Sequence, residues 1–402
     1  MIAAARLAFT LSIVLHYIFP MITIGGLFWL FVTSCSNRVF ELRRQVVLML
    51  LFVSIGISTG YVLKWHFNEF WPDYLHIIAT AFDPLLGIEA LLSIAGFIVF
   101  ASVYFWSHSR GSRLGIRYSL LGLFLTTLIS SVIITSVNSW MQYPTGIRIM
   151  NSPLGTQLEY GNLNTVFFNP TFLTRLYHTL IGALMLGIAF QSTFSKLWRR
   201  SATMVLLLLW LGQFVVGHRH AAESYAFQPE KFAAFEGHNS TYSPADLWLF
   251  PGLDKKYNIK LSGMTSYLLY SDVDRDVVGT NAWKDEYISD RAEETFITYH
   301  VMILAHFLVF ALLILKVFNL FQSRDKTLNV FIVILLFIAN LFGWFTAEWG
   351  RQPWMIRGVL KTQDAFHSGA TVHPYTGVFY TLMAIVLPLI VYRLLRNKVI
   401  LV

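Results

Sequence analysis

The chain has 402 residues, of which 55% are hydrophobic, 16% aromatic and 13% charged. A soluble domain carries roughly 25% charged residues, so this composition excludes an ordinary soluble protein and indicates a membrane protein. The single cysteine, Cys35, excludes an internal disulfide and any site built from several cysteines. The net charge of +8 does not indicate a nucleic-acid partner, because the basic residues lie in short connections between apolar runs.

Nine apolar runs are candidates to cross a bilayer, which takes about 20 residues. In chain order they cover residues 3–33, 45–65, 83–106, 118–137, 172–194, 202–218, 296–318, 328–347 and 375–395. The run at 202–218 is the shortest and is marginal. The pattern predicts an all-α membrane protein, a bundle of about nine transmembrane helices. It divides the chain into six helices (1–218), an insert (219–295) and three further helices (296–402).

Positive residues gather in alternate connections and in the tail. They are Arg38, Arg43 and Arg44; Arg110, Arg113 and Arg117; Lys196, Arg199 and Arg200; Lys316, Arg324 and Lys326; and Arg393, Arg396 and Lys398. Short positive loops mark the cytoplasmic side, so the N-terminus is expected outside and the C-terminus inside. Thirteen of the 22 carboxylates lie between Arg219 and Glu294. We therefore expect the insert to be a partly ordered lid on the outer face.

Few ionisable side chains lie inside the runs. They are His16, Glu89, His178, His300, His306 and, closing the eighth run, Glu348. At 1.5 Å per residue, Glu89, His178 and Met302 each lie roughly 9–11 Å inside the outer end of their helices. Candidate ligands on several helices are thus predicted to lie at similar depth in the outer half of the membrane.

A lone intramembrane histidine more often bonds a neighbouring helix than a metal. Several histidines at one depth, with a methionine and carboxylates, favour heme, whose iron takes His and Met axial ligands. Met302 alone would be ordinary core. Since His306 lies one turn further on the same face, spacing leaves His300, Met302 and His306 open as ligands.

Two motifs carry a family resemblance. Residues 343–354, GWFTAEWGRQPW, close an apolar run with a carboxylate, an arginine and three tryptophans. This segment resembles the quinol-oxidising subunit I of cytochrome bd-type oxidases. Residues 228–237, QPEKFAAFEG, resemble the start of that family's quinol-binding loop. The likeness runs from about residue 7 to 395.

The resemblance implies a role for each intramembrane candidate. His16, in LHYIFP, would ligate a high-spin heme at the oxygen site. His178, which follows FNP, and Met302, in YHVM, would ligate a low-spin heme b. Glu348 would ligate a high-spin heme b. Glu89, in IEA, would lie beside the oxygen-reducing heme and deliver protons.

The resemblance also assigns the insert. Lys231 and Glu236 would bind and deprotonate the quinol, although their charges alone would suggest a solvated turn. Trp140, Trp344 and Arg351 would border the hemes.

Five departures from the family pattern are visible, and one of them is a short quinol loop without a long C-terminal insertion. Phe97 stands where a second membrane glutamate is usual, so the proton route is open. Lys64 and His66 replace an acidic residue and a glutamine. His300 replaces an arginine, and Ala90 replaces a glycine. These changes leave open whether the oxygen site holds heme d or a further heme b.

The resemblance implies a quinol:oxygen oxidoreductase that takes ubiquinol or menaquinol and reduces O2 to water. It implies a second membrane subunit (subunit II), small single-helix subunits, and a multi-pass location in the bacterial inner membrane. One alternative is a heme b electron-transfer or quinone-reactive protein without oxygen reduction. Another is a heme-free transporter whose His and Glu side chains relay protons.

Overall fold

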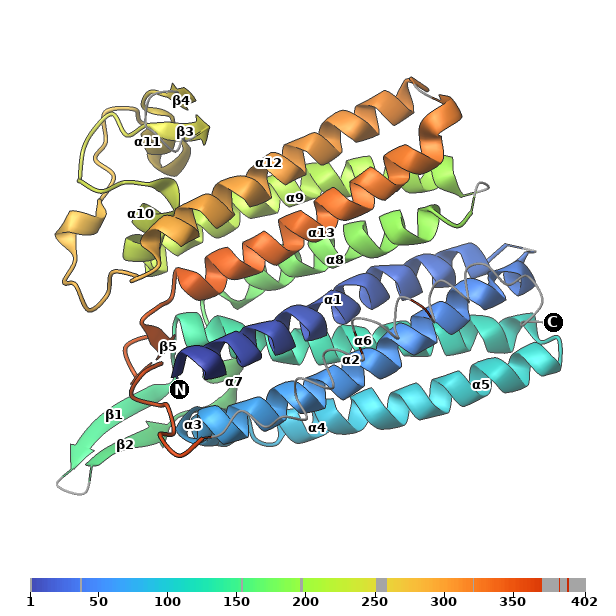
Figure 1. The fold of residues 1–402 in the computed structure, drawn as a ribbon, viewed down its shortest axis with the longest axis horizontal. Helices are drawn as coiled ribbons and strands as arrows, with labels where there is room; N and C mark the ends of the chain where they lie inside the picture. The colour runs from blue at the N-terminus through green and yellow to red at the C-terminus, as the bar shows by residue number, and fades with distance from the viewer. Residues whose placement is uncertain are drawn as a thin grey trace.

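Eight long helices lie side by side in an elongated bundle (Figure 1). The computed structural model describes residues 2–36, 38–152, 155–195, 198–250, 259–320 and 322–370, and beyond these only residues 383 and 389. Within these residues, eight helical segments are long and apolar enough to cross a membrane. The predicted ninth span, 375–395, lies almost wholly outside the described residues. The predicted helical membrane fold is confirmed for the other eight.

The spans keep the order of the apolar runs. They are α1 (Ile2–Ser34), α2 (Arg43–Phe70), a composite of α4 (Leu85–Leu91), a π-helical turn (Leu92–Gly96) and α5 (Phe97–Ser109), then α6 (Arg113–Gln142), α8 (Phe172–Ser192), α9 (Arg199–Phe227), α12 (Ala292–Val317) and α13 (Asp325–Trp349). The shorter helices are α3 (Pro72–Phe82), α7 (Leu163–Phe167), α10 (Pro229–Glu236) and α11 (Met264–Tyr270). Three antiparallel hairpins pair β1 (Ile147–Ser152) with β2 (Gly155–Tyr160), β3 (Leu247–Phe250) with β4 (Ile259–Leu261), and β5 (Trp354–Ile356) with β6 (Leu360–Lys361).

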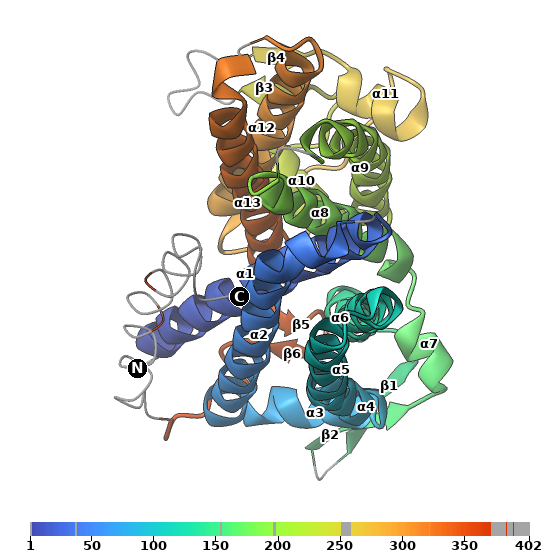
Figure 2. The same ribbon diagram turned by 90° about the vertical axis from the view of Figure 1, so that its right-hand side faces the viewer.

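Helix α1 joins the two halves of the bundle. Seen along the bundle, it lies between α8, α9, α12 and α13 on one side and α2, α5 and α6 on the other (Figure 2). Its approach to α8 is close because both helices carry glycine at the contact. A Cβ built on Gly187 would lie 2.2 Å from the Gly26 backbone nitrogen, and one built on Gly25 would lie 2.3 Å from the Ala183 carbonyl oxygen. Small residues of this kind let membrane helices pack backbone to backbone.

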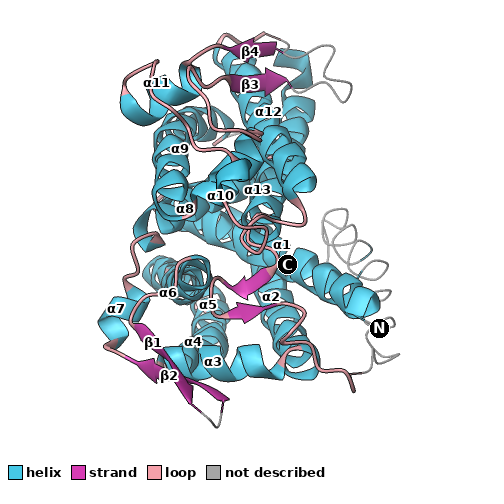
Figure 3. Ribbon diagram, turned by 90° about the vertical axis from the view of Figure 1, so that its left-hand side faces the viewer, coloured by secondary structure: helices cyan, strands magenta, loops and turns pink. Residues whose placement is uncertain are grey.

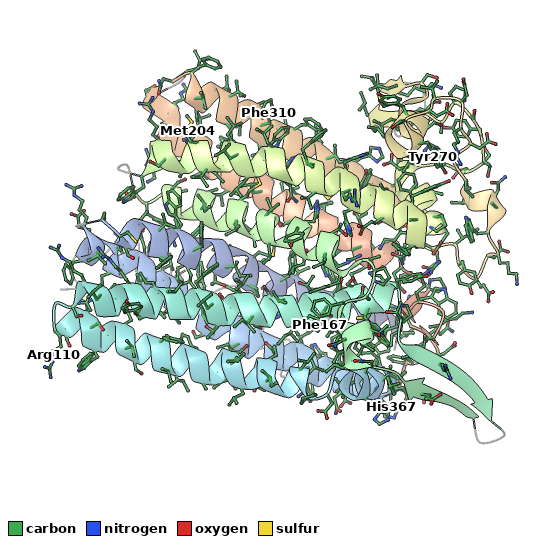
Figure 4. The ribbon with its side chains drawn as sticks, turned by 180° about the vertical axis from the view of Figure 1, so that it is seen from behind. Arg110, Phe167, Met204, Tyr270, Phe310 and His367 are labelled. Atoms are coloured by element: carbon green, nitrogen blue, oxygen red, sulfur yellow. The ribbon has the colours of Figure 1, made fainter. Side chains whose placement is uncertain are left out.

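The two ends of the bundle differ in chemistry. At one end, Asp325 accepts from Lys316 Nζ at 2.5 Å and from Arg199 Nη1 at 2.9 Å, which joins α12, α13 and α9. The insert and all three hairpins lie at the opposite end (Figure 3). Figure 4 shows the same division, with Arg110 at the first end and Tyr270 and His367 at the second.

The insert begins later and is more ordered than the sequence predicts. Helix α9 continues to Phe227, nine residues past the predicted end at 218, and two polar side chains of its last turns contact α8. Among them, Glu223 accepts a hydrogen bond from Thr174 of α8. Helix α10 follows; it starts with a proline, which suits the first helical turn. It ends at Gly237, whose φ of 77° is the left-handed conformation that glycine adopts readily.

Candidate functional site

His16 is held by α2 in an orientation suited to ligation. Its Nδ1 donates to the Gly56 carbonyl oxygen at 3.1 Å, so the neutral ring carries its lone pair on Nε2. Metal-binding histidines commonly fix their second nitrogen in this way. Gly60 lies opposite the ring, since a Cβ there would be 3.0 Å from His16 Cε1. The neighbouring Tyr17 contacts Trp344 of α13, with ring centroids 6.2 Å apart.

Glu348 lies in a buried polar cluster contributed by three helices. Arg351 forms an ion pair with it, and Asn138 of α6 donates to its Oε1 at 2.9 Å. Asn138 in turn accepts from Arg175 Nη1 of α8 at 3.1 Å. In the described part of the chain, Arg351 Nε and Nη1 and Arg175 Nε are buried without a hydrogen-bond partner. These buried N–H groups need acceptors beyond Glu348 and Asn138, and the carboxylates of a heme could supply them. The donor set therefore fits heme.

His178 faces α9. Gln213 Nε2 lies 3.2 Å from its Nδ1, and the His220 ring centroid is 5.5 Å from that of His178. A Cβ on Gly217 would lie 3.4 Å from His178 Cε1, so the glycine leaves room beside the imidazole.

The three candidate ligands on α12 differ in availability. Both ring nitrogens of His300 lie against carbonyl oxygens, Phe296 O at 2.8 Å and Trp248 O at 3.0 Å, so neither nitrogen faces open space in this structure. The Met302 sulfur faces α13, where a Cβ on Gly343 would lie 2.8 Å from it. His306 stacks on Trp210, with ring centroids 4.8 Å apart. The geometry therefore leaves Met302 and His306.

Glu89 faces α6 rather than a second carboxylate. Its Oε1 accepts from Ser93 at 2.8 Å and from Ser130 of α6 at 2.5 Å. Phe97, about two turns further, packs against the apolar cluster of α1, α2 and α6. The Glu89 carboxylate therefore accepts hydrogen bonds from two hydroxyl groups.

Trp140 is fully buried and packs edge-on against Phe82.

The two residues predicted to bind quinol are buried on α10. Lys231 Nζ donates to Gln142 Oε1 at 2.9 Å and to the Ala347 carbonyl oxygen at 2.8 Å, one residue before Glu348. Burial, and then nearby Arg175, hold the pKa of Lys231 well below its usual range. Lys231 therefore ties the insert to the Glu348 cluster.

Glu236 lies at the other end of α10. Tyr299 of α12 donates to its Oε1 at 2.7 Å, whereas its Oε2 is buried without a partner in the described part of the chain. Burial raises the pKa of Glu236 to about 7, partly offset by the bond from Tyr299. A carboxyl group with such a pKa can accept and release a proton near neutral pH.

Sequence reasoning missed several of these neighbours. The sequence could have indicated Arg175 as a site residue, because it lies one turn before His178 at the end of a span. Gln142 lies two residues after Trp140, which the resemblance placed beside the hemes. The sequence gives no indication that Tyr299 and Gln213 contact the site. Their roles come only from the packing of α12 on α10 and of α9 on α8.

Relatives match this chain over nearly its whole length. The chain is 26% identical to the cytochrome bd ubiquinol oxidase subunit 1 of Bacillus subtilis (strain 168), over 91% of this chain and 86% of that protein. It is 25% identical to a putative cytochrome bd menaquinol oxidase subunit I of the same strain, over 98% and 97%. It is 23% identical to the cytochrome bd-II ubiquinol oxidase subunit 1 of Escherichia coli (strain K12), over 91% and 90%.

A solved structure shares the fold. The bd oxidase from Geobacillus thermodenitrificans superposes with a TM-score of 0.84, at 21% identity, over 98% of each chain. These matches favour neither the heme protein without oxygen reduction nor the heme-free transporter. The family profile described as cytochrome bd terminal oxidase subunit I matches residues 4–399. The predicted resemblance is confirmed: the chain is a multi-pass membrane protein that belongs to the cytochrome bd terminal oxidase subunit I family.

Proposed function

We propose that this chain is the quinol-oxidising, heme-bearing subunit of a membrane quinol:oxygen oxidoreductase. One observation carries the proposal: polar contacts connect α10 to the cluster around Glu348. Lys231 bonds the Ala347 carbonyl group, which adjoins Glu348 in the chain, and Glu348 connects through Asn138 to Arg175. Arg175 precedes His178 by one helical turn. The predicted quinol site therefore lies against the predicted heme ligand Glu348, and His178 lies one turn from the same cluster.

The α10 end of that network suits the oxidation of a quinol to a quinone, which releases two electrons and two protons. Glu236 has a free buried oxygen and a pKa near 7, so it can take a proton from a quinol hydroxyl. Lys231 orients the site, because its two hydrogen bonds fix α10 against α6 and α13. The relatives named above are ubiquinol and menaquinol oxidases, so both quinols are candidate substrates.

The ligand assignment follows from the donors available. His178 with Met302 would hold a low-spin heme b, Glu348 a high-spin heme b, and His16 the heme of the oxygen site, either heme d or a further heme b. Arg351 and Arg175 would neutralise heme carboxylates. Trp344, against Tyr17, places an aromatic ring between α1 and α13. When bound, the hemes carry electrons and reduce O2 to water; the chain supplies ligands, spacing and a low dielectric.

Protons for oxygen reduction would reach the site at Glu89. Ser93 and Ser130 can pass a proton to this carboxylate because both hydroxyl groups already donate to it. We place the insert outside and the arginine-rich end in the cytoplasm, following the positive-inside pattern. The partners are then subunit II and small single-helix subunits, in the bacterial inner membrane.

Oxygen-electrode measurements on the purified complex with subunit II, combined with heme extraction, test this function. The proposal predicts several hemes per complex and quinol-dependent oxygen uptake. A complex that contains heme and is reduced by quinol but never consumes oxygen would contradict the terminal step. A complex without heme would contradict the whole proposal.

A further inference from the structure

The β3–β4 hairpin of the insert is attached to the side of a membrane-spanning helix rather than to its end. His300 Nε2 of α12 lies 3.0 Å from the Trp248 carbonyl oxygen of β3, within hydrogen-bond distance. The hairpin accordingly lies beside the first turns of α12 in Figure 1, and at the edge of the molecule next to α12 in Figure 3. A hairpin in this position need not be surrounded by water.

The depth of this attachment can be estimated along α12. We take Lys316, paired with Asp325, as the opposite membrane boundary, because charged side chains are costly inside lipid. From Lys316 to His300 there are 16 residues, which span about 24 Å at 1.5 Å per residue. The hydrocarbon core is about 30 Å thick, so His300 lies roughly 6 Å inside the far boundary. Helix tilt would shorten the vertical distance and place His300 deeper still.

The hairpin exposes apolar side chains at that level. Leu249 is 45% exposed, Ile259 59% and Leu261 41%. On α12, Ile297 and Leu304 flank His300 one turn to either side, and both are exposed. The apolar surface of the hairpin therefore continues the apolar surface of a membrane-spanning helix, which lipid covers.

The polar residues of the hairpin suit the edge of a bilayer. Lys260 Nζ lies 5.4 Å from the Trp248 ring centroid and bonds Asp246 at 2.6 Å. Tryptophan is enriched where headgroups meet acyl chains, and lysine covers apolar surface with its stem while its ammonium group stays in water. This pairing of an aromatic ring with a half-exposed lysine matches a lipid headgroup layer.

We propose that the β3–β4 hairpin inserts into the headgroup–acyl boundary of the membrane leaflet on the insert side, so that lipid covers Leu249, Ile259 and Leu261. This part of the insert is then seated in the membrane surface, while the segment around Asp272 faces water. This inference stands on the packing of the hairpin against α12 and does not depend on the heme or quinol assignments.

Site-directed fluorescence tests this placement in the assembled complex. In a Cys35→Ser background, Ile259→Cys is labelled with an environment-sensitive fluorophore and the complex is reconstituted in phosphatidylcholine vesicles. The background complex without the new cysteine gives the signal of any thiols in other subunits. Asp272→Cys, at an exposed polar position of the same insert, is the matched control.

We expect lipids with a spin label near the headgroup to quench the probe at 259 several-fold more than iodide does. The probe at 272 should show the reverse. Strong quenching of the 259 probe by iodide would overturn the proposal, and quenching by neither agent would overturn it by showing a protein cover. Leu261→Cys repeats the test, with the same expectations, if Ile259→Cys does not assemble.

Discussion

Replacing Tyr299 with phenylalanine removes the hydroxyl group that donates to Glu236 Oε1 at 2.7 Å and leaves the ring that packs on Phe235. A hydrogen bond to a charged group contributes about 1.5–3 kcal/mol, which corresponds to about 1–2 pKa units. Because the bond stabilises the ionised carboxylate, its loss raises the pKa of Glu236 further above its present value of about 7. The proton acceptor is then ionised only at higher pH.

The assay is the pH dependence of kcat/KM for quinol in the assembled complex. Activity needs the carboxylate, so it is lost as pH falls through the pKa of Glu236. In Tyr299→Phe this loss should begin about 1–2 units higher, giving about a 5- to 50-fold lower rate at pH 7 and recovery in alkaline buffer. Heme content should not change.

Tyr270→Phe is the matched control, since that hydroxyl group donates to Tyr225 at 2.9 Å and not to a carboxylate. It should leave the pH profile unmoved. If Tyr299→Phe lowered activity equally at all pH values, Tyr299 would have only a packing role. An unchanged profile would mean that Glu236 is not the proton acceptor.

Further substitutions test the remaining assignments. His178→Ala should abolish the low-spin heme signal and quinol oxidation; an unaltered reduced spectrum would refute the ligand assignment. His16→Ala should stop oxygen uptake while quinol still reduces the low-spin heme, and normal uptake would show that the oxygen site lies elsewhere. Lys231→Met should raise the KM for quinol because α10 loses two bonds to the bundle, with hemes retained; loss of all hemes would indicate a structural role. Gly187→Leu would force side-chain atoms into the α1 backbone near Gly25, so immunoblots should show little assembled subunit, and normal levels would contradict the packing.

The spans were predictable because a bilayer demands about 20 apolar residues in a row, and eight of the nine predicted runs fall on observed helices. The end of α9 was not predictable from hydropathy. Its last turns contain His220 and Glu223, which stop an apolar run, yet these side chains face His178 and Thr174 across a helix contact. Hydropathy cannot distinguish a polar residue that faces water from one that faces another helix.

The residues of the candidate site likewise include some that the sequence indicates and others that only the packing of the helices brings in. Ligand types and motif matches made His16, His178 and Glu348 candidates from the sequence. The hydrogen bond between Glu236 and Tyr299 joins residues 63 positions apart on different elements, and no periodicity or motif connects them. Such partners follow only from how helices pack.

The central claim is that membrane helices of this chain hold hemes and that quinol reduces these hemes. The reduced-minus-oxidised absorption spectrum of the purified complex tests it most directly. On addition of quinol without another reductant, heme bands should appear in the wild-type complex, and these bands should be lost in Lys231→Met at low quinol concentration. A preparation with no heme absorption, or with heme bands that quinol does not change, would contradict the account.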